Sequence, residues 1–186
     1  KELVEWDQEI NHATDGDSQE SYLCLDSDVA KDLYGDEIDS DWRFNYQLEE
    51  KYYGYYYRTL KYYKQTENKS EGKISNRTLP MIRMSEVYYI AAEAIFDTNP
   101  KEAQGYLELV KKGRGISKKF DNVTNKSEFI NLLVNDARRE FLGEGQIFYM
   151  YKRLNRLMPA SSFYDSDVLP TDENMVLPKP DSESNI

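Results

Sequence analysis

The chain has 186 residues, 39% hydrophobic and 31% charged, which fits one globular domain of ordinary size. Its net charge of −10 argues against nucleic acid as a ligand, because phosphates require a basic surface, and against docking on anionic lipid. No apolar run approaches the ~18 residues that a membrane-spanning helix needs. The aromatic residues are mostly tyrosine (16 Tyr, 7 Phe and 2 Trp). Tyrosine suits half-buried surfaces and polar ligands, although ordinary packing accounts for most single tyrosines.

The first fifty residues are acidic and rich in turn-forming residues, so only short elements are expected there. Residues 22–25 favour an extended segment. A brief helix should follow over residues 28–34, with Ser27 as its cap and Gly35 at its end.

Residues 51–64 combine many tyrosines with Gly54, which predicts short strands forming a hairpin or containing a bulge. Residues 65–76 hold almost nothing apolar and are predicted to be a loop.

From residue 81 the pattern becomes helical. Apolar residues at steps of three and four predict a helix over residues 81–97, and Asn99-Pro100 should end it and start a second helix over 101–113. Two such helices form a hairpin similar to one tetratricopeptide unit, which cannot bury its own apolar face, so further helices must pack on it. The expected core stripe of the first helix consists of Met84, Val87, Tyr88, Ala91, Ala94 and Ile95.

A third helix is expected over residues 127–142, where Asn125 and Glu128 have the spacing of a capping pair. A fourth should run from Ile147 and fade before Pro159. Residues 159–186 contain four prolines and many acidic residues, which predicts an irregular tail over the surface.

Several segments resemble, in the right order, motifs of the SusD/RagB family. None is specific by itself, but the ordered set covers the chain from about residue 20 to its end. The segments are Asp41-Trp42-Arg43, Lys61-Tyr62, the helix within residues 79–94, residues 136–146, Lys152-Arg153-Leu154 and residues 176–180.

This resemblance implies a mainly α fold: a SusD-like, tetratricopeptide-type helical bundle with irregular loops and a short β hairpin in its first half. It divides the chain into a loop-rich, Tyr-rich, ligand-facing region (1–80), a helical core (81–158) and an irregular tail (159–186). The sequence departs from the family at four positions: Asp136 replaces a Glu, Ala137 and Ile147 each replace an Arg, and Met150 replaces an Asp. We therefore expect the end of the third helix to lack a buried ion pair.

The resemblance also implies a function. SusD-type proteins bind glycans or another nutrient, without catalysis, at the bacterial outer surface and deliver them to a SusC-like TonB-dependent transporter. They are lipid-anchored outer-membrane proteins, and the anchor would lie outside this sequence. One alternative is a protein-interaction scaffold that docks on the transporter. A third hypothesis, a glycoside hydrolase, would use Glu86, Glu93, Glu140 or Glu144.

A sugar site needs flat aromatic faces beside polar side chains. Trp42 is the strongest candidate, being an aromatic residue in a polar turn, and the competing interpretation is a core anchor under that turn. The full set of predicted ligand-binding residues is Asp41, Trp42, Arg43, Asn45, Tyr52, Tyr53, Tyr55 and Tyr57.

No catalytic residue, metal site or cofactor is predicted. Glu86 and Glu93 lie on one side of a helix, but Arg138 and Arg139 can neutralise them, which favours a structural ion-pair network. The only cysteine, Cys24, has apolar neighbours, and the sequence contains no phosphate-binding loop, Cys/His metal spacing or nucleophile elbow.

Overall fold

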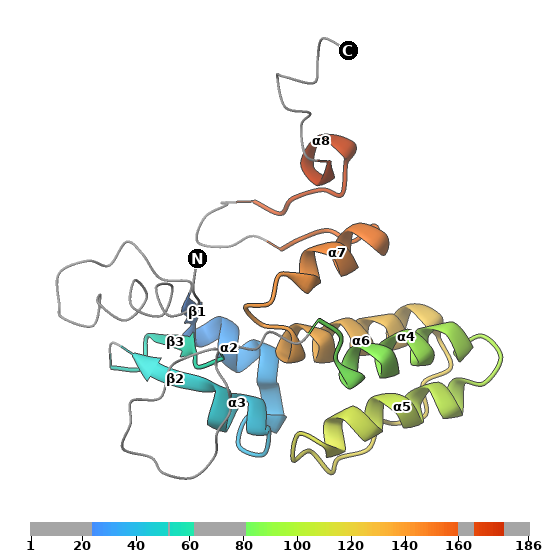
Figure 1. Cartoon of the computed structure of the whole chain (residues 1–186), viewed down its shortest axis with the longest axis horizontal. Helices are drawn as coiled ribbons and strands as arrows, with labels where there is room; N and C mark the ends of the chain where they lie inside the picture. The colour runs from blue at the N-terminus through green and yellow to red at the C-terminus, as the bar shows by residue number, and fades with distance from the viewer. Residues whose placement is uncertain (1–23, 52, 62–80, 160–165, 177–186) are drawn as a thin grey trace. The chain divides into compact units, whose positions relative to one another are not determined.

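The computed structural model describes residues 24–51, 53–61, 81–159 and 166–176. Within these ranges the chain is mainly helical with one small sheet, which confirms the predicted fold class (Figure 1). The chain divides into two compact units, residues 1–143 and 144–186.

Three short strands form the sheet of the first unit: β1 (Cys24–Asp26), β2 (Leu48–Lys51) and β3 (Tyr56–Thr59). The spatial order is β1-β3-β2, with both pairs antiparallel. The predicted hairpin is therefore present, and it begins slightly earlier than expected. Tyr53 and Gly54 have φ values of 58° and 88°, so the turn needs the left-handed conformation that glycine adopts without strain.

Helix α2 (Ser27–Tyr34), the short 3₁₀ helix η2 (Gly35–Glu37) and helix α3 (Trp42–Gln47) pack beside this sheet. The cap of α2 is Asp26 rather than Ser27, because the Asp26 carboxylate accepts a hydrogen bond from the Asp28 N–H at 2.8 Å. A small hydrophobic cluster joins the helices to the sheet. It is formed by Leu33, Tyr34 and Leu48, with Leu25, Ile38, Phe44, Tyr57 and Leu142 around them.

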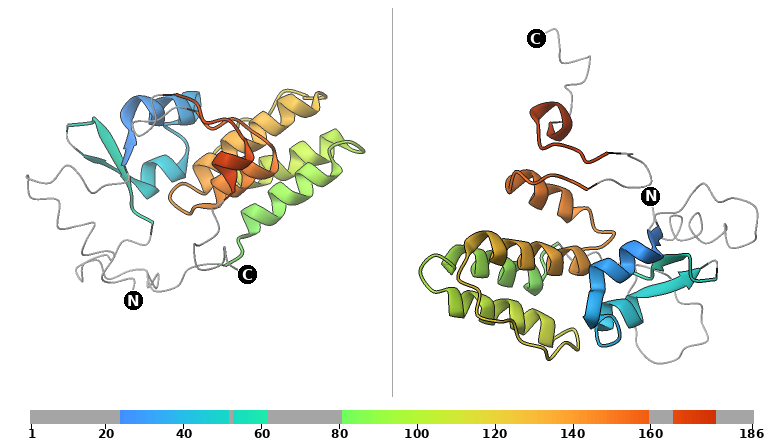
Figure 2. Two further views of the ribbon diagram at one scale, coloured as in Figure 1. Left: turned by 90° about the horizontal axis from the view of Figure 1, so that it is seen from above. Right: turned by 180° about the vertical axis from the view of Figure 1, so that it is seen from behind.

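Three longer helices form the rest of the first unit: α4 (Met84–Ile95), α5 (Pro100–Lys112) and α6 (Lys126–Glu140). They agree with the predicted helices within a few residues. Asn99 and Asn125 cap α5 and α6 by accepting hydrogen bonds from backbone N–H groups three residues on. α4 and α5 form the expected hairpin, and α6 packs against both (Figure 2).

Aromatic and small residues fill the core between these helices. Phe96 of α4 stacks on Phe129 of α6 with ring centroids 4.2 Å apart, and Tyr89 meets Phe141 edge to face at 5.7 Å. Burial of each such side chain contributes roughly 1.5–3 kcal/mol. Ala92, Ala103, Leu107, Leu133 and Ala137 are fully buried between the rings.

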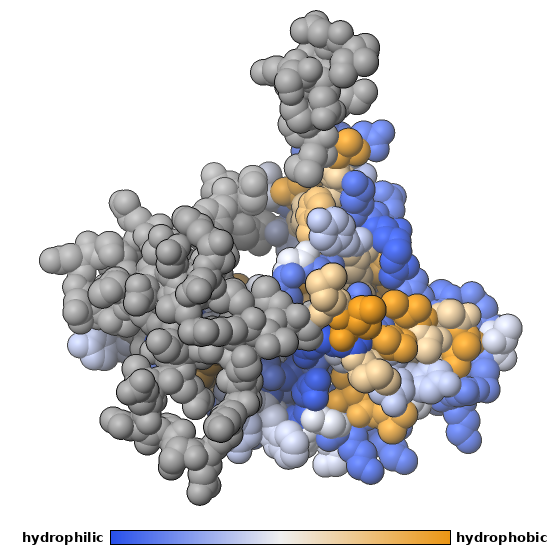
Figure 3. Space-filling model, in the orientation of Figure 1, coloured by the Kyte–Doolittle hydropathy of each residue, from blue (hydrophilic) through white to orange (hydrophobic). Residues whose placement is uncertain are grey.

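The predicted core stripe of α4 is only partly buried. Tyr88, Ala91 and Ile95 are half-buried, but Met84 is 66% exposed, Val87 is 42% exposed and Ala94 is exposed. Ile90, which was not part of the predicted stripe, is exposed as well. The buried face instead consists of Ser85, Tyr89, Ala92 and Phe96. α4 has apolar side chains on more than one face; α5 and α6 both pack against it, and the face with Met84, Val87 and Ile90 stays uncovered. Hydrophobic side chains consequently gather in the region of α4 on the face shown in Figure 3.

A long loop, residues 113–125, connects α5 to α6 and is held at both ends. Ile116 is buried, and its N–H bonds the Lys111 carbonyl at 3.0 Å. Further on, the Gln104 side chain bonds both backbone groups of Val123, at 2.8 and 3.0 Å. The loop is therefore fixed to α5 although it has no regular structure.

The second unit contains α7 (Gln146–Arg153), α8 (Asp172–Met175) and an antiparallel bridge between Met158 and Val168. α7 confirms the predicted fourth helix, whereas α8 was not expected in the tail. The three-part division of the chain stays a prediction, since many of its residues lie outside the described ranges. Among the helices described, none is both long and apolar enough to cross a membrane.

Candidate ligand-binding site

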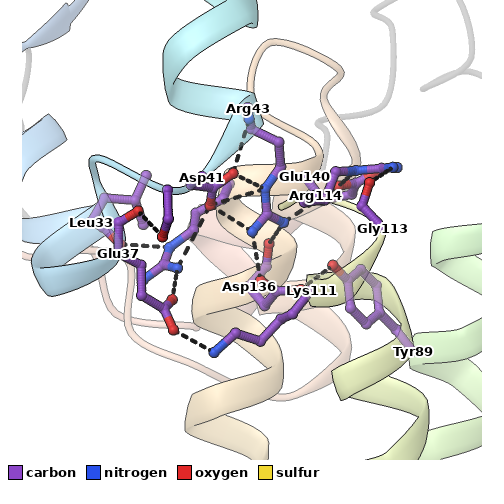
Figure 4. A network of polar contacts seen from close by, with 12 residues as sticks. Leu33, Glu37, Asp41, Arg43, Tyr89, Lys111, Gly113, Arg114, Asp136 and Glu140 are labelled. Atoms are coloured by element: carbon purple, nitrogen blue, oxygen red, sulfur yellow. Dashed lines mark hydrogen bonds and ion pairs between the residues drawn. The ribbon is translucent and has the colours of Figure 1, made fainter. Parts of the chain in front are cut away.

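Asp41 and Arg43 lie at the start of α3, where they form the centre of a buried ion-pair network (Figure 4). The Asp41 carboxylate caps α3 by accepting from the Arg43 N–H at 2.9 Å, and it also accepts from Nε and Nη2 of the same residue at 2.9 and 2.8 Å. Arg43 is 1% exposed. The contacts between Asp41 and Arg43 therefore already hold both side chains in place.

The Arg43 guanidinium reaches across to α6. Its Nη2 donates to Asp136 Oδ1 at 2.8 Å, and its Nη1 lies 3.4 Å from Glu140 Oε2. Tyr89 of α4 donates its hydroxyl to the other oxygen of Asp136 at 2.6 Å. One buried network therefore joins α3, α4 and α6.

Glu140 is the second centre of the network. Arg114 donates to its two carboxylate oxygens at 2.9 and 2.6 Å, and Arg83 forms a further ion pair with it. The backbone carbonyl of Glu140 accepts from Lys61 Nζ at 2.7 Å. Cations at the C-terminus of α6 are favourable because the helix dipole is negative there.

The electrostatics of Glu140 follow from these contacts. Burial by itself would raise the pKa of Glu140, but the hydrogen bonds and charges of Arg114, together with the charges of Arg83 and Arg43, outweigh burial and lower the pKa to about 2. A general acid needs a pKa near the working pH. Glu140 is thus poorly suited to the glycosidase role considered above.

A third carboxylate extends the network toward α5. Glu37 pairs with Lys111 Nζ at 2.6 Å and with Arg139 Nη1 at 2.5 Å, and Arg139 also donates to the Leu33 carbonyl at 2.7 Å. A structural ion-pair network was predicted, but its members differ. Arg139 was expected to pair with Glu86 or Glu93 of α4, but it pairs with Glu37. Glu140 pairs with Arg83 and Arg114.

The burial of Asp41 and Arg43 changes the predicted site. Their polar atoms are occupied by partners within the protein, so a ligand could reach them only by displacing a buried ion pair. We no longer propose these two residues as ligand contacts. Asn45 is exposed, and its amide donates to the Asp39 carbonyl at 3.0 Å.

Trp42 differs from both its neighbours because it is 53% exposed. Its backbone N–H donates to the Arg114 carbonyl at 2.9 Å. Its indole edge packs against Gly115, where an added Cβ would meet the ring and would lie 2.7 Å from the Ser40 carbonyl oxygen. Trp42 therefore combines a fixed position with an accessible ring surface.

Other exposed aromatic residues lie on the same part of the chain. Tyr46 follows Trp42 by one helical turn and is 73% exposed. Sequence reasoning missed it, although the four-residue spacing was visible. Tyr53 and Tyr55 are exposed in the hairpin turn, whereas Tyr57 packs on Phe44 with centroids 5.0 Å apart. Tyr52 lies outside the described residues.

No metal site is evident in the described ranges, where no three His, Cys, Asp or Glu side chains are grouped to hold an ion. Asp39 and Asp41 are two positions apart, but the Asp41 carboxylate acts as a helix cap and ion-pair partner.

Residues 38–175, more than half of the chain, match the SusD family. The chain belongs to the SusD family. A solved structure with the same fold is a SusD superfamily protein from Bacteroides vulgatus ATCC 8482, crystallised at 1.80 Å resolution, with a TM-score of 0.59 and 23% identity. The match covers 83% of this chain but only 35% of that one, so the chain spans about a third of that relative's length. No curated protein matches this chain.

The SusD-like motifs found in the sequence converge on the network. Asp41, Arg43, Lys61, Arg83, Asp136 and Glu140 all come from those motifs, and all take part in it. The expectation that the end of α6 lacks a buried ion pair was wrong, because the shorter Asp136 still reaches Arg43. In this SusD-family chain the motif residues thus hold the fold together.

Proposed function

We propose that this chain is the C-terminal part of a SusD-type protein that binds glycans or another nutrient at the bacterial outer surface without catalysis. The bound cargo would pass to a SusC-like TonB-dependent transporter, and a lipid anchor outside this sequence would hold the protein at the membrane. Membership of the SusD family supports the binding role. The observation that carries a site on this chain is the fixed, half-exposed Trp42.

The physical reason lies in how sugars are held. The C–H face of a pyranose ring is apolar and packs on a flat aromatic surface, while its hydroxyl groups need hydrogen-bonding partners at the rim. Trp42 offers the larger surface, and Tyr46 adds a ring one turn away on α3. Because the network fixes the start of α3, little conformational entropy is lost when Trp42 binds a ligand.

Binding to a panel of polysaccharides, by affinity electrophoresis and calorimetry, tests the proposal. Trp42→Ala should weaken binding of a recognised glycan about tenfold, because a stacked ring is lost. Tyr149→Ala is the matched control, since Tyr149 is an exposed aromatic in the second unit. The absence of binding to every glycan, or equal losses in both variants, would count against the site. Release of reducing sugar would contradict a non-catalytic role.

A protein-interaction scaffold remains the second candidate, and the exposed apolar stripe of α4 favours it. Met84, Val87 and Ile90 present a surface of the kind that protein partners cover. Capture of the transporter without any sugar, lost in Val87→Glu, would support this role. If Val87→Glu captures the transporter as well as the parent does, the apolar stripe of α4 is not the binding surface.

A further inference from the structure

The end of α5 and the loop that follows it are strongly basic in a chain whose net charge is −10. From Leu109 to Phe120 the sequence contains no acidic residue. It contains five basic ones: Lys111, Lys112, Arg114, Lys118 and Lys119. A local excess of positive charge on a negatively charged protein attracts negatively charged ligands.

Two of these five basic side chains form ion pairs within the protein. Lys111 pairs with Glu37, and Arg114 pairs with Glu140. The other three, Lys112, Lys118 and Lys119, are exposed, and none has a hydrogen-bond or ion-pair partner among the described residues. Their ammonium groups are available to a ligand.

These lysines lie close to Trp42. The Trp42 ring packs on Gly115, and Lys112 and Lys118 each lie three positions from Gly115 along the chain. Even a fully extended chain places those Cα atoms within ~11 Å of Gly115, and a lysine side chain spans part of that distance. Two acidic residues border the pair Lys118 and Lys119: Asp121 follows the pair in the sequence, and Glu108 of α5 accepts a hydrogen bond from the Phe120 N–H at 3.2 Å.

We propose that Trp42 and the loop lysines form a subsite for an anionic sugar residue, carrying either a carboxylate or a sulfate group. This inference rests on the proposed glycan-binding function and adds a class of ligand to it. The indole packs on the apolar face of the ring, and the lysines attract the negative group without fixing its geometry, as a compact point charge does. Anchoring of the loop by Ile116 and Val123 keeps the lysines near the tryptophan.

The test uses pairs of probes that differ only in charge. Oligogalacturonate is compared with its methyl ester, and dextran sulfate with dextran, each by calorimetry on the full 186-residue chain. The acidic member of at least one pair should bind about three- to tenfold more tightly than the neutral one, and the difference should shrink as salt is raised. A difference within the oligogalacturonate pair indicates a carboxylate ligand, and a difference within the dextran pair indicates a sulfate ligand.

The variants assign the charge to the loop. Lys118→Gln and the double variant Lys118→Gln/Lys119→Gln should lower affinity for the acidic probe and leave the neutral one unchanged. Lys101→Gln removes the same charge at the other end of α5, about 16 Å from Lys112 along the helix, and should change neither.

The outcomes are distinct. Equal binding of acidic and neutral probes, or an equal effect of Lys101→Gln and Lys118→Gln, overturns the inference and leaves the proposed function standing. Failure to bind any glycan counts against both. A loss of neutral binding in the double variant indicates that the lysines support the loop, and this also overturns the anionic subsite.

Discussion

Glu140 shows how a carboxylate can stay charged when it is buried. Three arginines, Arg43, Arg83 and Arg114, face it from three different segments of the chain. Removing water from a charge is costly, and the cost is offset only when partners surround the group. Substitution of a single member therefore leaves the remaining charges buried and uncompensated.

Glu140→Gln should lower the free energy of unfolding by about 3–5 kcal/mol, because the arginines lose the central negative charge. Urea unfolding at neutral pH measures this change. Glu128→Gln, at an exposed position of the same helix, is the control and should stay within about 0.5 kcal/mol of the parent. Similar stability for Glu140→Gln and Glu128→Gln would show that the network contributes little.

Gly115→Ala should destabilise the protein by about 1–3 kcal/mol. The residue has φ of +85°, and its new Cβ would meet the Trp42 ring and the Ser40 carbonyl oxygen. Thermal unfolding measures the loss. Gly105→Ala is the matched control: nothing lies within 4 Å of its Cβ position inside α5, so this change should be neutral or stabilising. An unchanged melting temperature for Gly115→Ala contradicts the tight packing of Trp42.

At the scale of elements, α6 is the helix that binds the first unit together. Asn125 satisfies its N-terminus, and Lys61 satisfies carbonyls at its C-terminus, at 2.7 Å from Glu140 and 3.1 Å from Leu142. Its side contacts α2, α4 and α5. Loss of its ends should therefore be felt by the whole unit.

Asn125→Ala should cost about 1 kcal/mol, because the Glu128 N–H loses its acceptor. Asn125→Asp replaces the amide oxygen with a carboxylate oxygen, which still accepts at the cap, and should keep the stability. Chemical denaturation of the three proteins measures both effects. Equal instability of the Ala and Asp variants would mean that Asn125 acts through something other than capping.

The helices and the hairpin could be predicted from the sequence, but their partners could not. Proline and asparagine at α5 and tyrosines with Gly54 in the hairpin are local signals, and they placed these elements within a few residues. α4 carries apolar side chains on more than one face, so periodicity alone could not tell which face α5 and α6 leave uncovered. The burial of Asp41 and Arg43 could not be predicted, because their partner Asp136 lies 93 residues from Arg43. Local sequence patterns carry no signal over such a distance, and they also left open whether Trp42 is exposed or a core anchor.

At the scale of the whole molecule, stability should depend on pH in the acidic range. The pKa of Glu140 is about 2 in the folded chain against 4.5 ordinarily, and the pKa of Glu37 is lowered too. A carboxyl group whose pKa is lower in the folded chain than in the unfolded chain stabilises the fold at any pH above its unfolded pKa. The free energy of unfolding should therefore be at its full value above pH 4.5 and fall between about pH 4.5 and 2. Glu140 accounts for about 3 kcal/mol of this loss. The free energy of unfolding, measured from pH 7 to 2, should depend less steeply on pH in Glu140→Gln than in the parent. The same pH dependence in both proteins contradicts the assignment to Glu140.

The exposed stripe of α4 should also affect the whole molecule. We expect the isolated 186-residue chain to self-associate reversibly as its concentration rises, because Met84, Val87 and Ile90 remain uncovered. Sedimentation velocity should detect this, and Val87→Glu should prevent it without lowering the melting temperature. Leu109→Glu, exposed on α5 outside the stripe, should still associate. A parent chain that is monomeric at every concentration contradicts the expectation.

The separation of Arg43 from Asp136 and Glu140, by 93 and 97 positions, has a consequence for the order of folding. Closing so long a loop costs entropy before any charge is neutralised. The α4–α5 hairpin needs only local contacts and can form first, while the guanidinium stays hydrated. The ion pairs of Arg43 with Asp136 and Glu140 would then form late in folding. Their main effect would be to slow unfolding rather than to speed folding.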